Sequence, residues 1–238
     1  MKSKKYTSLI IGLLAATSGI TFATVTISTQ FGQAFDAASA TVPDGTLWAL
    51  IVDDGVGTLP GGMLTDGSGL SAAYALNSTL VNDTFAGQSI GIGTSFGGDI
   101  VFGMGAFNGE NDLGVPGSTT NGLAGLVLGE NGLATGRAIG FYFFPGVTYT
   151  AAGTYNIGSQ VGGISTLVAD AGAGTDGMVV PADSGAVFIG ANTDAGGDLG
   201  GSMTDAAFTA VTLTAVPEPS AALLGAIGAL GLLRRRRI

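Results

Sequence analysis

The sequence contains no cysteine and no histidine. Their absence excludes imidazole acid–base catalysis, thiol nucleophiles and disulfides, together with the usual side-chain ligands of zinc, copper, haem and iron–sulfur sites. A serine hydrolase with a histidine-dependent triad is excluded as well, because no imidazole is present to activate the hydroxyl. The chain retains only oxygen chemistry, from carboxylates, hydroxyls and backbone carbonyls.

Basic residues are scarce and lie almost entirely at the two ends of the chain. Eight Lys and Arg stand against seventeen Asp and Glu, and Arg137 is the only base between Thr24 and Pro217. Of the seventeen acids only Glu218 lies in the C-terminal tail. Such a polyanionic body repels nucleic acid, because phosphate contacts require Lys and Arg. We therefore expect no nucleic-acid partner.

The first 23 residues have the three parts of a secretory signal. Three lysines within the first five residues precede the apolar run Leu9–Ala16, and small or polar residues follow. The apolar run is far shorter than the ~20 residues of a membrane-spanning helix. The small residues Thr21 and Ala23 suit a signal peptidase that cuts before Thr24. We therefore interpret residues 1–23 as a signal peptide.

The last 23 residues also fall into three parts. These parts are the motif Val216-Pro217-Glu218-Pro219-Ser220, the apolar run Ala221–Leu233, and the cluster Arg234, Arg235, Arg236 and Arg237. The prolines prevent a helix or a strand ladder across Glu218, which keeps that residue extended and accessible to a protease. The arginines hold the end of the apolar run on the cytoplasmic side of a membrane, which places the body outside.

This tripartite end resembles the PEP-CTERM sorting signal of bacteria that have an outer membrane and an exopolysaccharide envelope. The resemblance covers residues 216–238 and implies that an exosortase-like membrane protease recognises, sorts and processes the chain. The apolar run of residues 221–233 is short for a ~30 Å hydrocarbon core at ~1.5 Å per helical residue. We therefore expect a hydrophobic helix that anchors the protein at least transiently. An ordinary tail anchor with a chance Pro-Glu-Pro is the alternative.

Residues 24–215 are rich in glycine and have the pattern of an all-β domain. Apolar residues alternate with others in three runs: Val25 and Ile27; Ile90 and Ile92; and Ile100, Phe102 and Met104. A period of two places each set on one face of a strand. Gly97-Gly98 predicts the turn of a hairpin between the second and third runs.

Two continuous apolar runs, residues 47–52 and 139–144, predict central strands that are covered on both faces. Pro145-Gly146 predicts a turn after the second of them, and Val211 with Leu213 predicts a last strand. Apolar residues spaced by three and four from Leu70 to Val81 predict one short helix. The fold class that we expect is a Gly-rich, two-layer β-sandwich with one short helix.

Carboxylates are the remaining candidates for a functional site. Calcium takes six to eight oxygen ligands, and three groups could supply some of them: Asp53 with Asp54, Glu110-Asn111-Asp112, and Asp194 and Asp198 with Asp205. The third group resembles part of an EF-hand loop, but Gly196 and Met203 stand where further ligands belong. The alternative is that these acids form solvated turns, as the acids beside glycine elsewhere in the body are expected to do.

A pair of carboxylates could also hydrolyse a glycan, but the two must face each other across the bond. Asp53 and Asp54 are adjacent, so in an extended chain they would point to opposite faces. The sequence therefore predicts a non-catalytic protein with no resident cofactor, exported to the cell envelope, surface or extracellular matrix, with exopolysaccharide as a candidate partner. The alternatives are a calcium-dependent carbohydrate-binding module and a carboxylate-based glycan hydrolase.

Overall fold

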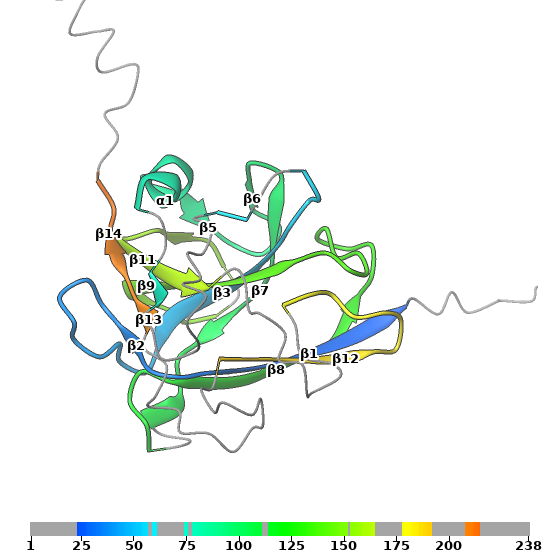
Figure 1. Cartoon of the computed structure of the whole chain (residues 1–238), viewed down its shortest axis with the longest axis horizontal. Helices are drawn as coiled ribbons and strands as arrows, with labels where there is room; N and C mark the ends of the chain where they lie inside the picture. The colour runs from blue at the N-terminus through cyan, green and yellow to red at the C-terminus, as the bar shows by residue number, and fades with distance from the viewer. Residues whose placement is uncertain are drawn as a thin grey trace, which may run out of the picture.

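The structure is a computed structural model that describes residues 23–56, 59–60, 74–75, 78–110, 114–151, 153–164, 178–191 and 208–214. The described part is an all-β sandwich accompanied by the short helix α1 (Ser78–Phe85), as the sequence predicts (Figure 1). No helix in these ranges is long and apolar enough to cross a membrane. The run 221–233 lies outside them.

A six-stranded sheet forms the centre of the molecule, and its neighbouring strands are antiparallel throughout. In spatial order the strands are β14 (Val211–Thr212), β11 (Gln160–Ile164), β9 (Ile139–Thr148), β3 (Thr46–Val52), β7 (Asp99–Ala106) and β6 (Ser95–Phe96). Every residue of β3 is buried, as are residues 139–145 of β9. The prediction of two central strands covered on both faces is confirmed.

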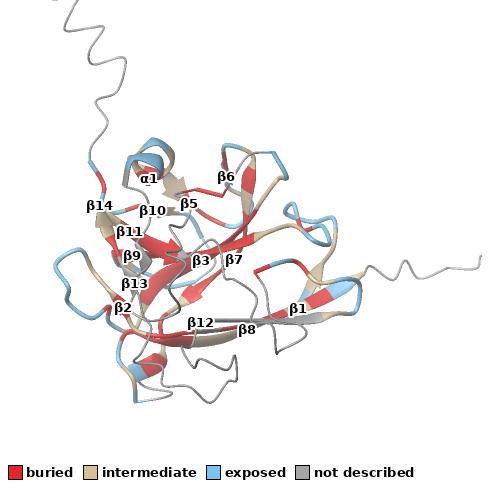
Figure 2. Cartoon of the chain, viewed as in Figure 1, coloured by how far each residue is buried: buried red, intermediate tan, exposed pale blue. Residues whose placement is uncertain are grey.

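The side chains of β3 alternate between two hydrophobic cores, one on each face of the central sheet. Trp48, Leu50 and Val52 belong to one core, whereas Leu47, Ala49 and Ile51 belong to the other. Figure 2 shows the buried residues concentrated in this sheet and the exposed ones in the loops around it. A strand with a core on both faces must be apolar at every position, which explains its continuous apolar sequence.

A second sheet covers the first of these faces. Its strand order is β12-β1-β8, formed by β12 (Ala186–Ala191), β1 (Thr24–Phe31) and β8 (Thr119–Val127). The middle strand, β1, is parallel to β12 and antiparallel to β8. Val25 and Ile27 of β1 are buried, and Phe31 stacks on Phe141 of β9 with ring centroids 3.8 Å apart. These contacts form the interior of the sandwich.

Helix α1 packs on the opposite face of the central sheet. Its Phe85 ring contacts the rings of Phe96, Tyr142 and Phe144 at centroid distances of 4.9–5.9 Å. Beside it lies the two-stranded sheet of β5 (Ser89–Ile90) and β10 (Tyr155–Asn156). A further small sheet joins β2 (Ala34–Phe35), β13 (Phe208–Thr209) and β4 (Tyr74–Ala75).

Glycines within the central strands provide room for large aromatic rings on the neighbouring strand. Trp48 of β3 pairs with Gly105 of β7, and a Cβ on Gly105 would overlap the indole ring. Phe143 of β9 pairs with Gly162 of β11 in the same way. The glycine content of the body therefore serves packing as well as turns.

Two predictions about the region before β7 need correction. Gly97 and Gly98 do form a hairpin turn, with φ of 69° and 121°, but it joins β6 to β7 and does not follow the run of Ile90 and Ile92. Ile92 lies in the turn between Gly91 and Thr94, where Thr94 N–H donates to Gly91 C=O, and it is 53% exposed. Of this pair only Ile90 lies in a strand, the two-residue β5, so the alternation of Ile90 and Ile92 predicted a longer strand than the structure has.

The prediction that Ile100, Phe102 and Met104 share one face is wrong for Met104. Phe102 packs in the sandwich core, whereas Met104 packs in the core under α1. The β3–β7 register shifts between the pairs Leu50–Gly103 and Ile51–Val101, so Phe102 is an extra residue. Such a bulge changes the face on which later residues lie.

The turn at Pro145-Gly146 and the extent of the helix were also predicted wrongly. β9 continues through both residues to Thr148, and its register with β3 shifts here, from Phe144–Leu47 to Thr148–Thr46. Proline lacks an N–H and fits such an irregularity. The helix begins at Ser78, and Tyr74-Ala75 pair with β13 instead. Residues 61–73, which include Leu70, lie outside the described residues.

Candidate functional site

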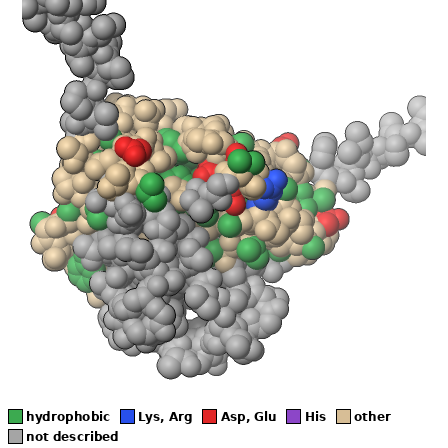
Figure 3. Space-filling model, turned by 45° about the horizontal axis from the view of Figure 1, so that its top comes forward, with side chains coloured by type: hydrophobic (Ala, Val, Ile, Leu, Met, Phe, Trp, Pro, Cys, Tyr) green, Lys and Arg blue, Asp and Glu red, His purple; other side chains and the backbone are tan. Residues whose placement is uncertain are grey.

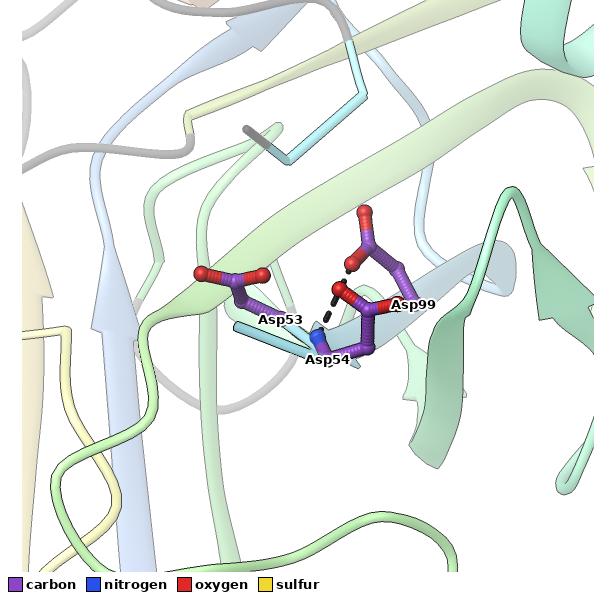
Figure 4. A group of neighbouring side chains, drawn as sticks. All are labelled: Asp53, Asp54 and Asp99. Carbon is purple, nitrogen blue, oxygen red and sulfur yellow. Dashed lines mark hydrogen bonds between the residues drawn. The ribbon is translucent and has the colours of Figure 1, made fainter. Parts of the chain in front are cut away.

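Three aspartates come together where β3 ends and β7 begins. Asp53 and Asp54 follow the last residue of β3, and Asp99 is the first residue of β7. The pairing of Val52 with Ile100 brings these two strand ends side by side. One carboxylate oxygen from each residue lies within 4.8 Å of the others (Figure 4). We call Asp53, Asp54 and Asp99 the acidic cluster.

Hydrogen bonds from the backbone fix all three carboxylates. Asp54 N–H donates to Oδ1 of Asp99 at 3.0 Å and Gly55 N–H donates to Oδ1 of Asp53 at 2.7 Å. Val56 N–H donates to Oδ1 of Asp54, also at 2.7 Å. The chain has left the strand here and turns at Gly55, whose φ is 82°. The alternation expected of an extended chain therefore does not apply, and the prediction that Asp53 and Asp54 point apart is wrong.

Two glycines allow the charged groups to approach the backbone. A Cβ on Gly98 would overlap Oδ2 of Asp54, and a Cβ on Gly55 would overlap Nη1 of Arg137. Arg137 is half-buried and is the only Lys or Arg among the described residues. The space-filling view accordingly shows one basic patch, with acidic side chains beside it (Figure 3). The cluster thus has a guanidinium packed on the same loop that carries two of its carboxylates.

Burial makes Asp99 differ from an ordinary surface aspartate. Its side chain is only 6% exposed, and this desolvation raises its pKa from 3.8 to about 6. The N–H of Asp54 opposes the rise, whereas the neighbouring carboxylates of Asp53 and Asp54 add to it. Near pH 6 Asp99 therefore exchanges a proton, and a bound cation would compete with that proton for the site.

The spacing of the carboxylates is compatible with calcium. Calcium–oxygen distances are about 2.3–2.6 Å, so two oxygens on one ion lie no more than about 5 Å apart. The carboxylates of the acidic cluster meet this limit at 4.8 Å. With a calcium ion bound, they would supply three of the six to eight oxygens that it takes, and backbone carbonyls or water would supply the others.

The sequence identified two members of this cluster and missed the third. Gly98-Asp99 has the composition of a turn, and only the pairing of β3 with β7 places it beside Asp53. A predicted hairpin at Gly97-Gly98 next to a predicted central strand was the available signal. Of the remaining candidates, Thr24 begins β1, Ala23 precedes it, and Glu110 is exposed and is not part of the acidic cluster. The others lie outside the described residues: Thr21, Asn111, Asp112, Asp194, Asp198, Asp205, residues 216–220 and residues 234–237.

No protein-family model, curated protein or solved structure matches the chain.

Proposed function

We propose that this chain is a non-catalytic protein exported to the cell envelope, surface or extracellular matrix, where an exosortase-like membrane protease sorts and processes it. The observation that carries the proposal is the order of motif, apolar run and arginines in residues 216–238, together with a secretory signal in residues 1–23.

The non-catalytic part of the proposal rests on side-chain chemistry. The chain has neither histidine nor cysteine. Asp99 has the pKa of a general acid, about 6, but its side chain is 6% exposed and already accepts a hydrogen bond from Asp54. A glycan hydrolase needs its acid to reach the scissile oxygen. This burial disfavours the hydrolase alternative, and a glycan-release assay tests it directly.

Removal of the C-terminal tag is the first test. In a strain with an active sorting protease, intact mass spectrometry of the envelope protein should find chains that end before Ile238. Glu218→Ala should leave the protein membrane-held and unprocessed, because the motif is changed while the apolar run remains. Neutral residues at positions 234–237 should instead weaken retention and orientation. Mature chains that still end at Ile238 would falsify the processing.

A second candidate function, calcium-dependent binding of an exopolysaccharide, is favoured by the acidic cluster. Three fixed carboxylates within 4.8 Å of one another present a concentrated negative charge that a calcium ion would neutralise. The ion would also relieve the repulsion that Asp53 and Asp54 exert on Asp99. Calcium held here would brace the ends of β3 and β7 and leave part of its coordination for sugar hydroxyls.

The test of this second candidate is a titration of the purified body, residues 24–215, with calcium chloride. Binding to the native state should raise the melting temperature progressively with calcium, beyond the effect of sodium chloride at equal ionic strength. Asp53→Asn with Asp54→Asn should remove the difference between the salts, whereas Asp183→Asn, an exposed aspartate elsewhere, should preserve it. Equal responses of the unmodified body to both salts would mean that these aspartates form a turn and do not bind calcium.

A further inference from the structure

The peptide bond between Ala23 and Thr24 is built into the folded sheet. Leu128 N–H donates to the carbonyl of Ala23 at 2.8 Å, and Ser184 N–H donates to the carbonyl of Thr24 at 2.9 Å. Thr26 N–H donates to Gly185 C=O at 3.0 Å. The backbone on both sides of the predicted cleavage point is therefore engaged by segments that come much later in the chain.

The residues that follow this bond belong to the most enclosed strand of their sheet. β1 lies between β12 and β8, and Val25 and Ile27 are 1% and 0% exposed. A protease binds its substrate as an extended segment and uses backbone groups on both sides of the scissile bond. In the folded protein those groups already have partners, so cleavage would require β1 to leave the sandwich.

The partners of β1 are distant in the sequence. Thr24 pairs with Val127 of β8, and Thr26 pairs with Ala186 of β12. A chain that crosses a membrane from its N-terminus cannot form either pairing until those strands have also emerged. Pairings between such distant segments also form slowly, because loop closure must precede them. The first residues of β1 therefore remain unpaired during much of export.

We infer that folding itself closes the signal-cleavage site, so that residues 1–23 are removable only before β1 is enclosed by β8 and β12. The reaction is hydrolysis: water adds across the Ala23–Thr24 bond, which leaves a carboxylate on Ala23 and an amino group on Thr24. The inference rests on the proposed function, because it takes residues 1–23 to be a cleaved signal. It adds an order of events: export in an unfolded state, cleavage, and then closure of the sandwich.

The experiment uses the full-length precursor and purified signal peptidase in detergent micelles. One sample is refolded before the enzyme is added, and the other is diluted from urea directly into the enzyme. Emission from Trp48, the only tryptophan and fully buried in the fold, reports whether each sample is folded. Mass spectrometry measures the rate of cleavage before Thr24. We expect the refolded precursor to be cut at least about tenfold more slowly, because only the locally opened fraction is accessible.

A matched variant separates the fold from the enzyme. A flexible Gly/Ser linker of about eight residues between Ala23 and Thr24 moves the cleavage point out of the sheet and leaves β1 intact. The refolded linker variant should be cut as fast as its unfolded form. If the refolded and unfolded precursors without the linker are cut at equal rates, the inference is overturned and the signal assignment stands. If no sample is cut near residue 23, unfolded precursor included, the signal assignment itself is wrong.

Discussion

The backbone N–H of Asp54 donates a 3.0 Å hydrogen bond to Oδ1 of Asp99, which joins the end of β3 to the start of β7 (Figure 4). This bond favours the charged form of Asp99, but burial disfavours it more strongly, and the pKa of Asp99 is raised to about 6. A buried carboxylate beside two others is therefore a local cost to the fold at neutral pH, and proton or cation binding would reduce that cost.

Asp99→Asn should stabilise the protein at pH 7 and above. The folded state binds the Asp99 proton more tightly than the unfolded state does. This tighter proton binding stabilises the fold fully below about pH 4, and the stabilisation is lost as pH rises through 6. At ~1.4 kcal/mol per pKa unit the loss is on the order of 2–3 kcal/mol. Asparagine keeps the acceptor for Asp54 N–H and carries no charge.

The measurement is urea unfolding followed by Trp48 fluorescence between pH 4 and pH 8, with a chelator present. The Asn variant should gain unfolding free energy over the unmodified protein as pH rises, and Asp183→Asn, at an exposed position, should not. Parallel pH profiles for the unmodified protein and Asp99→Asn would show that Asp99 does not titrate in the folded state as its pKa of about 6 requires.

Gly98→Ala should destabilise the protein more than Gly97→Ala. Both glycines have positive φ, so each alanine costs about 1–2 kcal/mol in backbone strain. A Cβ on Gly97 meets no atom within 4 Å, whereas one on Gly98 would overlap the carboxylate of Asp54. Gly98→Ala should therefore lower the free energy of unfolding in urea by ~1 kcal/mol more than Gly97→Ala does. It should also weaken any response to calcium, which Gly97→Ala should retain. Equal losses in both variants would mean that Asp54 moves aside freely.

The central strands were predictable because their sequences carry the signal locally. Residues 47–52 and 139–144 are apolar at every position, which only a strand covered on both faces tolerates. The bulge at Phe102 was not predictable, because a register shift depends on the partner strand. Pro145-Gly146 has the composition of a turn, and the pairing of β9 with β3 overrides that local preference.

The acidic cluster shows the same division between local and distant information. The Asp53-Asp54 pair is visible in the sequence, and its turn arises from neighbouring residues. Asp99 lies 45 positions after Asp54 and joins the pair only through the β3–β7 register. The parallel pairing of β1 with β12 is still more distant and has no local signature. Sequence patterns therefore identified the central strands β3 and β9 and two of the three aspartates, whereas the register of the sheets and the position of Asp99 depend on tertiary pairing.

Gly105→Ala should destabilise the core, because the indole of Trp48 occupies the space that a Cβ would need. Trp48 is fully buried and donates from Nε1 to Ala106 C=O at 2.9 Å, so the ring cannot shift without losing that bond. Overpacking of this kind costs roughly 1–3 kcal/mol. Gly122→Ala in β8, where a Cβ meets nothing within 4 Å, is the matched control and should be neutral or slightly stabilising. The free energy of unfolding in urea measures both, and a neutral Gly105→Ala would contradict the packing role of that glycine.

Asn82→Ala should loosen the backbone at Thr214, with little effect on global stability. Thr214 N–H donates to Oδ1 of Asn82 in α1 at 2.7 Å, and Leu213 N–H donates to Ser159 C=O at 2.8 Å. The first bond is exposed, so its loss should cost only about 0.5–1 kcal/mol locally. Hydrogen exchange should quicken at Thr214 and stay unchanged in β3 and β9. Asn82→Asp keeps an acceptor oxygen and should preserve the slow exchange.

Under the proposed function, Val216 begins the sorting motif two residues beyond Thr214, so this loosening should also give the membrane protease freer access to Glu218. The Ala variant should then lose its C-terminal tag faster than the Asp variant in the same strain. Equal exchange at Thr214 in both variants would mean that Asn82 does not restrain the backbone at Thr214.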